Sequence, residues 1–146
     1  MNKTTTDRIK QLLTTQKTGV LATLSPTYPY TTLVAFVIID DWRSLLFMTP
    51  RETQKYENLQ NNNAISFLID NRMNTPSDFS QATTLTILGK AAEVDKQDYQ
   101  ESYLQQHPEL SDFFHHPKSA MMKVTIEYFL LVKDFQTVVK VQPQDL

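Results

Sequence analysis

The run from Leu46 to Leu59 holds the side chains of this chain that are best suited to bind a phosphate group. It contains two hydroxyls, Thr49 and Thr53, and two cations, Arg51 and Lys55. An apolar stretch of strand length comes first, and the sequence Thr-Pro-Arg-Glu that follows is typical of a helix start. Helix starts attract anions because their first N–H groups lack intrahelical partners and the peptide dipoles add there. The run therefore predicts a phosphate seat between a strand and a helix.

The predicted helix spans Glu52 to Asn61 and begins with the capping box Thr49-Pro50-Arg51-Glu52. In that geometry the first backbone N–H groups of the helix would point at the ligand, and Glu52 would be occupied as the capping partner. Arg51 and Lys55 would lie one helical turn apart on the same side. The alternative interpretation is a capped helix start that binds nothing, since capping boxes begin many such helices.

The composition excludes several classes of function. A chain of 146 residues with 40% apolar and 21% charged residues is typical of one soluble globular domain. Its net charge of -2 gives no electrostatic basis for binding nucleic acid. The absence of cysteine excludes disulfides, thiolate metal sites and a cysteine nucleophile. With only two glycines, the chain cannot build a glycine-rich nucleotide loop.

The polar N-terminal residues and the longest apolar stretch bear on where the protein is located. The first residues, Met1 to Asp7, are polar, and no apolar core of a signal peptide follows them. The longest apolar stretch, Leu33 to Ile39, is far too short to span a bilayer. We therefore expect no export signal and no membrane span, and a cytoplasmic protein.

Hydrophobic periodicity predicts a fold that is mainly antiparallel β with helices. The predicted strands are Val20–Leu24, Thr31–Ile39, Leu45–Met48, Ala64–Ile69, Thr83–Val94, Lys123–Val132 and Thr137–Val141. The predicted helices are Thr6–Gln16, Glu52–Asn61, Asp95–Gln106 and Pro108–Phe114, and a long loop covers Asn71–Gln81. Six or seven strands with short connections indicate an antiparallel barrel rather than a doubly wound parallel sheet.

Five segments, taken in order, resemble the flavin-binding split-barrel family that includes pyridoxamine 5'-phosphate oxidase. They are Gly19-Val20-Leu21-Ala22-Thr23; Pro29 before Thr31-Thr32-Leu33-Val34; the run from Phe47 through Thr53 and Lys55 to Leu59; Ile65-Ser66-Phe67; and Leu88-Gly89-Lys90-Ala91. The resemblance covers most of the chain. It implies a single FMN-binding split-barrel domain over residues 1–146 and a homodimer with two FMN sites at the subunit interface.

The resemblance also implies which residues contact the cofactor. They are Thr32, Leu33, Val34, Met48, Thr49, Thr53, Gln54, Lys55, Arg72 and Thr84, with Asn71 beside Arg72. The first three would run beside the isoalloxazine and ribityl chain, and the five from Met48 to Lys55 would hold the phosphate end. Gln54 stands where the oxidases usually carry an arginine, and Thr84 where a glutamine is common. The phosphate seat is therefore expected to have one cation fewer than in those enzymes.

The expected function is that of an FMN-dependent oxidoreductase, a reductase or oxidase acting on an unidentified small molecule. The sequence names no catalytic residue, because the flavin itself carries the redox chemistry. Vitamin B6 oxidation is disfavoured, since Val141–Leu146 lacks the tryptophan and arginine of the C-terminal segment that those enzymes use.

Several alternatives stay open. One is a haem-binding or haem-utilisation protein of the same fold, with His107, His115 or His116 as the ligand. Another is a non-catalytic flavin- or ligand-binding module, and a deazaflavin could replace FMN. A metal site is not expected, because no cysteine or carboxylate spacing completes a ligand set around the histidines.

Overall fold

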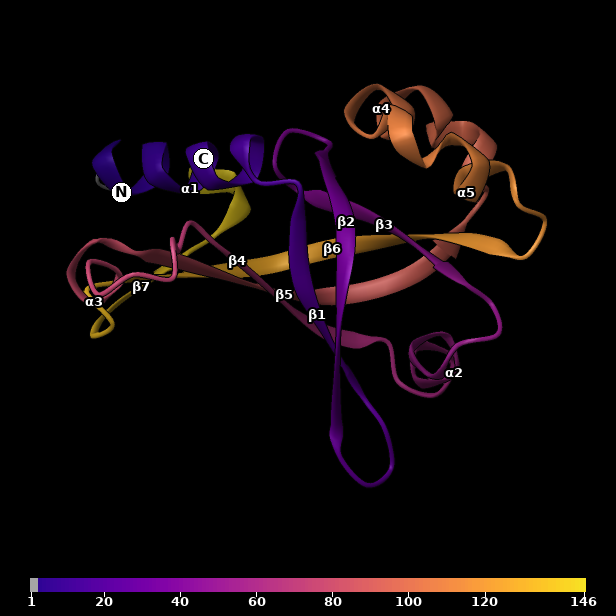
Figure 1. Ribbon diagram of the computed structural model, residues 1–146, viewed down its shortest axis with the longest axis horizontal. Coiled ribbons are helices and arrows are strands. Elements are labelled where there is room, and N and C mark those ends of the chain that lie inside the picture. The colour runs from indigo at the N-terminus through magenta and orange to yellow at the C-terminus, as the bar shows by residue number, and fades with distance from the viewer. Residues whose placement is uncertain (1–2) are drawn as a thin grey trace.

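An antiparallel sheet that closes into a barrel forms the centre of the computed structural model, which describes residues 3–146 (Figure 1). Its strands are β1 (Thr18–Leu24), β2 (Pro29–Ile39), β3 (Ser44–Pro50), β4 (Ala64–Asp70), β5 (Thr83–Val94), β6 (Ser119–Lys133) and β7 (Thr137–Val141). They pair in the order β3-β2-β1-β4-β5-β6-β7, and β3 also pairs with β6. Six strands therefore form the barrel and β7 extends it as a seventh, which confirms the predicted fold class.

Helices cover both ends of the barrel (Figure 1). They are α1 (Lys3–Thr15), α2 (Gln54–Asn61), α3 (Asp78–Gln81), α4 (Gln100–Gln106) and α5 (Ser111–His115), with 3-10 turns at Lys96–Tyr99, Pro108–Leu110 and Pro143–Asp145. In Figure 1, α1 and α3 lie at one end of the sheet, whereas α2, α4 and α5 lie at the other. Within residues 3–146, none of the helices is long and apolar enough to cross a membrane.

The barrel is split along one seam. β2 and β3 pair only from Phe36↔Phe47 to Ile39↔Ser44. The first half of β2, from Pro29 to Ala35, pairs with β1 alone, and the last residues of β3 pair with β6 alone. The two strands therefore separate beyond Phe36, and α2 packs against β1 and β3 at that end. We call this region the β2–β3 gap.

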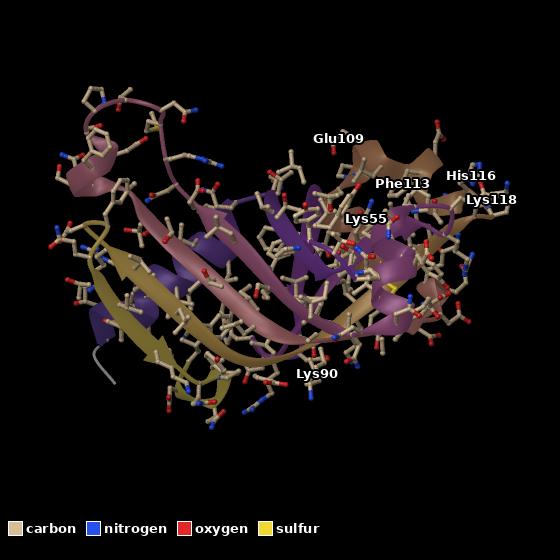
Figure 2. The ribbon with its side chains drawn as sticks, turned by 90° about the horizontal axis from the view of Figure 1, so that it is seen from below. Lys55, Lys90, Glu109, Phe113, His116 and Lys118 are labelled. Atoms are coloured by element: carbon tan, nitrogen blue, oxygen red, sulfur yellow. The ribbon has the colours of Figure 1, made fainter. Side chains whose placement is uncertain are left out.

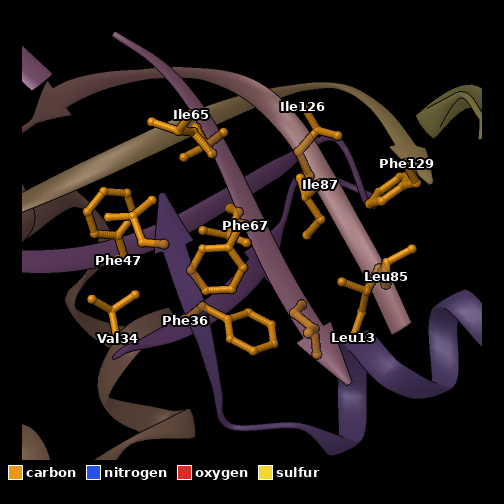
Figure 3. Close-up of a cluster of buried hydrophobic side chains, with 14 of the residues drawn as sticks. Leu13, Val34, Phe36, Phe47, Ile65, Phe67, Leu85, Ile87, Ile126 and Phe129 are labelled. Carbon is orange, nitrogen blue, oxygen red and sulfur yellow. The ribbon is translucent and has the colours of Figure 1, made fainter. Parts of the chain in front are cut away.

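Two apolar clusters hold the barrel and its helices together. The interior contains buried side chains from every strand, and Figure 3 shows Phe36, Phe47 and Phe67 among them. Phe36 and Phe67 meet edge to face, with ring centroids 5.4 Å apart. Because side chains alternate along a strand, the neighbours Val37 and Met48 point the other way. They form a second cluster beneath α4 and α5.

Several element boundaries differ from the prediction. The expected loop Asn71–Gln81 contains the short helix α3, which ends two residues before β5 begins. β6 begins at Ser119 rather than Lys123, and the helix expected from Pro108 to Phe114 is a 3-10 turn followed by α5. The helix expected from Asp95 to Gln106 is a 3-10 turn followed by α4, although Asp95 does accept the hydrogen bond of Gln97 N at 3.0 Å as a cap. The turn Asp40-Asp41-Trp42 has positive φ values of 56°, 54° and 69°.

Gly89 is required by the close approach of β5 and β6. The register of the two strands shifts between Leu88 and Gly89, and a Cβ atom at Gly89 would lie 2.3 Å from the carbonyl oxygen of Thr125. Because that oxygen belongs to paired backbone, we expect Gly89→Ala to lower the free energy of unfolding by about 1–3 kcal/mol. Urea denaturation measures this change. Ala92→Ser, at an exposed position of the same strand, is the control and should change stability by less than about 0.5 kcal/mol. Equal midpoints for the two variants would contradict the close approach.

Candidate functional site

The helix after β3 begins later than the sequence predicts. Thr53 is its N-cap, and the Thr53 hydroxyl accepts the hydrogen bond of Tyr56 N at 3.3 Å. Gln54 is the first helical residue, and Pro50 is the last residue of β3. The predicted capping box from Thr49 to Glu52 is therefore wrong, and so is the predicted helix start at Glu52.

Pairing with a distant segment explains the late start. Arg51 N donates to the carbonyl oxygen of Lys118 at 2.8 Å, which continues the β3–β6 edge past the proline. The carboxylate of Glu52 accepts from Lys118 Nζ at 2.8 Å instead of capping the helix. The Arg51 guanidinium lies 2.7 Å from the carboxylate of Glu93, so this cation is already neutralised by a protein group.

The two predicted hydroxyls meet inside this turn. Thr49 Oγ1 and Thr53 Oγ1 are 2.9 Å apart, and both lie within 3.0 Å of the carbonyl oxygen of Pro50. Thr49 is buried, whereas Thr53 is half-buried. The hydroxyls therefore brace the turn, and Thr53 is the member of the pair that a ligand could reach.

Lys55 lies in the first turn of α2 (Figure 2). It is half-buried, and within residues 3–146 its side chain has no hydrogen bond and no ion pair. Burial lowers the pKa of its amine below the ordinary value of 10.5. A cation that is partly removed from water and lacks a protein partner would gain from an anionic ligand.

Thr32 supplies the second unsatisfied group beside the β2–β3 gap. Among the residues that the structure describes, its Oγ1 is the only buried side-chain oxygen or nitrogen without a hydrogen-bond partner. Buried polar atoms are almost always hydrogen-bonded, so an unpaired hydroxyl indicates a ligand or an ordered water. Thr32 belongs to the half of β2 that β3 does not pair, and Lys55 belongs to the helix that packs at the same end.

The residues next to Thr32 and Thr49 in the sequence differ in exposure. Leu33 is 70% exposed on the outer face of the sheet. Val34 is buried in the barrel core, and Met48 is buried beneath α4 and α5. The side chains of Val34 and Met48 are therefore part of the apolar packing, and only the backbone of these two residues could contact a ligand.

Gln54 and Asn58 form a link that the sequence prediction missed. Gln54 Nε2 donates to Asn58 Oδ1 at 2.8 Å, and Asn58 Nδ2 donates to Thr23 Oγ1 at 3.0 Å. Asn58 is buried and connects α2 to β1, so it fixes the helix that carries Lys55. The sequence feature that could have indicated this link is a polar residue, Asn58, next to Leu59 on the apolar side of the predicted helix.

Arg72, Asn71 and Thr84 lie elsewhere in the chain. β4 starts directly after α2 and ends at Asp70, so these residues lie a strand length, about 20 Å, from the α2 end. Arg72 Nε lies 3.2 Å from the Asp70 carboxylate, and Thr84 points to the outer face of β5, opposite Asp70 in register. One chain alone does not bring them together with Lys55.

Each of the three histidine rings has a hydrogen-bond partner within the protein. His107 is buried, and its Nε2 lies 2.8 Å from the carbonyl oxygen of Phe36, to which it must donate. His116 Nδ1 accepts from Lys118 N at 3.1 Å, so the neutral ring carries its proton on Nε2. His115 Nδ1 donates to Ser111 O at 2.8 Å, which leaves a lone pair on Nε2. Within the described part of the chain, no three histidine, aspartate or glutamate side chains cluster as a metal site.

Solved structures share the fold at low sequence identity. A general stress protein 26-related protein from Clostridium acetobutylicum is 14% identical, with a TM-score of 0.76 over 99% of each chain. An FAD-binding protein from Mesorhizobium loti is 16% identical, with a TM-score of 0.66 over 90% of this chain and 94% of that one. A heme binding protein from Mycobacterium smegmatis is 11% identical, with a TM-score of 0.82; the match covers 99% of this chain and 60% of that one. At these identities the similarity shows the fold alone.

The sequence itself identifies the family. No match was found among curated proteins. The family model described as pyridoxamine 5'-phosphate oxidase, however, matches residues 5–133. That match includes the β2–β3 gap, α2 and six strands of the barrel. The chain therefore belongs to the pyridoxamine 5'-phosphate oxidase family.

Proposed function

We propose that this protein binds FMN at the β2–β3 gap and uses it as an oxidoreductase on a small molecule. The observation that carries the proposal is Lys55, a half-buried cation without a partner among residues 3–146. It lies at the end of the barrel where the two strands separate. Family membership and the FAD-binding protein of the same fold support a flavin as the ligand.

The residues around the gap offer groups that complement the phosphate and the ring of FMN. Lys55 would pair with the phosphate, and the Thr53 hydroxyl at the helix start would turn its proton from Pro50 O to the phosphate. The unpaired edge of β2 from Pro29 to Ala35 offers backbone donors and acceptors, which suit the polar edge of a flavin ring. The Thr32 hydroxyl would gain the partner that it lacks. FMN supplies the redox chemistry when bound, and the protein supplies position and electrostatics.

A homodimer belongs to the same proposal. Leu24 and Leu33 lie on the outer face of β1 and β2, and they are 45% and 70% exposed. Large apolar side chains that are exposed together indicate an interface. Thr84 points to the same outer face of the sheet. A second copy packed on this face would therefore bring Thr84 of one chain toward the cofactor of the other, which one chain alone does not do.

Haem is the second candidate ligand. His115 favours it, because donation of Nδ1–H to a backbone carbonyl leaves a lone pair on Nε2, the usual arrangement of a metal-binding histidine. Iron would have to displace Gln100 Nε2, which lies 3.5 Å from that atom. The heme binding protein from Mycobacterium smegmatis has the same fold. His115 is exposed, however, and has no other metal-ligating side chain clustered with it among the described residues. The arrangement therefore supports FMN better.

Replacement of Lys55 tests the phosphate contact. A charge-assisted hydrogen bond contributes about 1.5–3 kcal/mol, so Lys55→Ala should weaken FMN binding by roughly 10- to 100-fold. Quenching of flavin fluorescence on titration measures the affinity. The matched control is Lys90→Ala, because Lys90 is an exposed lysine that lies 3.9 Å from the Glu127 carboxylate (Figure 2). Unchanged affinity in Lys55→Ala would remove this residue from the site.

The same titration has a predicted pH dependence. Burial lowers the pKa of Lys55, so the amine loses its proton at lower pH than an ordinary lysine does. FMN affinity should therefore fall as the pH rises toward 10.5, the ordinary lysine value. Lys55→Arg keeps its charge over that range and should flatten the profile.

Replacement of Leu33 tests the dimer. Leu33→Glu places a charge in the proposed interface and should shift the protein from dimer to monomer in sedimentation velocity. The matched control is Val138→Glu, since Val138 is 59% exposed on β7, outside the proposed interface. If both variants sediment as the unchanged protein does, the outer face of β1 and β2 is not the interface.

A further inference from the structure

A polar groove lies between α1 and the segment that follows β4. Figure 1 shows α1 at the end of the sheet opposite α2. Its volume is about 440 Å³, within the range of small-molecule sites. Its polar lining consists mainly of Arg8, Gln11, Gln16, Asn71, Gln81 and Thr83. None of these residues belongs to the β2–β3 gap, so the groove is separate from the proposed flavin site.

The charge of the groove is positive although the chain is negative overall. The side chain of Arg8 has no hydrogen bond or ion pair to any other described residue. In the part of the chain that the structure describes, no carboxylate lines the groove. Asp70 pairs with Arg72, and Asp78 accepts from the backbone N–H groups of Met73 and Asn74. Asp7 precedes Arg8 in α1 but does not line the groove. The Arg8 guanidinium is therefore available to an anion.

Asn71 is held in one orientation at the opposite wall. Its backbone N–H donates to Thr83 O at 3.3 Å, and its Oδ1 accepts from Thr83 N at 2.8 Å. This pair of bonds determines which side-chain atom is nitrogen, so Nδ2 remains as a donor. A fixed amide donor facing a groove with a free guanidinium is a pre-organised arrangement for an acceptor ligand.

The carbonyl groups at the end of α1 oppose an anion, because they carry the negative end of the helix dipole. Three carbonyls in the last turns of α1 are already engaged. The hydroxyls of Thr14 and Thr15 donate to the carbonyls of Lys10 and Gln11 at 2.9 and 2.7 Å, and Gln16 N donates to Leu12 O at 3.1 Å. These bonds reduce the repulsion and leave the Arg8 charge as the main field in the groove.

We propose that this groove binds a small organic anion through a carboxylate group. Arg8 would pair with the carboxylate, since a planar guanidinium matches its two oxygens. Asn71 Nδ2 would donate to the same group or to the adjoining part of the ligand, and the amides of Gln11, Gln16 and Gln81 can donate or accept along its length. The groove lies about a strand length from Lys55 of the same chain, so a failure of succinate binding would leave the Lys55 test of the proposed function unaffected.

Nuclear magnetic resonance on the full-length, ¹⁵N-labelled protein tests the proposal, with succinate as the probe and succinamide as its neutral counterpart. We expect succinate to cause saturable shifts of Arg8 and of the side-chain amides of Asn71 and Gln81. Succinamide should cause at most weak shifts. Arg8→Gln should lower succinate affinity at least about tenfold, because it removes a charge-assisted bond. The control Arg43→Gln removes an arginine from the exposed Asp40–Arg43 turn and should bind as the unchanged protein does.

A second variant separates charge from folding. Asn71→Asp keeps the acceptor that Thr83 N requires and adds a negative charge to the groove, so the fold should persist while succinate binding is lost. Three results would overturn the proposal: equal shifts with succinamide, unchanged succinate affinity in Arg8→Gln or Asn71→Asp, or shifts that do not saturate.

Discussion

The end of the β2–β3 ladder at Phe36↔Phe47 is the constraint on which the rest of this structure depends. A barrel interior is dry, so backbone groups that lose their strand partner need another one. Beyond the last pair, β2 keeps β1 as its single neighbour and β3 keeps β6. The gap leaves backbone groups of β2 without a strand partner, and the proposed FMN would supply hydrogen bonds to them.

α2 carries the cation of the proposed FMN site, and several non-local bonds fix the position of this helix. Asn58 ties the helix to Thr23 of β1, and the Tyr56 hydroxyl donates to the carboxylate of Glu93 on β5. Arg51 shares that carboxylate. Lys55 stands between these anchored residues without a partner of its own among residues 3–146. Fixed neighbours reduce the conformational entropy that Lys55 would lose when it binds a phosphate.

Local patterns in the sequence predicted much of this arrangement. Alternating apolar residues located all seven strands, and the strand-to-helix transition near Lys55 was predicted from the types of its residues. The capping box at Thr49–Glu52 failed because Arg51 N bonds to Lys118 O, and no local signal reports a partner so far along the chain. The burial of Met48 beneath α4 and α5 likewise depends on tertiary packing.

The groove beside Arg8 could not be predicted for the same reason. It forms only when α1 packs near the segment after β4, so its residues are far apart in the sequence. Its amides are common surface residues, and nothing in their local spacing distinguishes them. Sequence reasoning proposed groups for an anion site, whereas the structure shows which of these groups already have protein partners.

The most direct test of the account is the identity of the small molecule that copurifies with the protein. Purified protein is denatured by heat, and the released compound is identified by mass spectrometry and quantified against the chain. The account predicts FMN in an amount close to equimolar with the chain, and a yellow protein before denaturation. Release of haem or a deazaflavin, or of no cofactor from protein first incubated with FMN, would contradict it.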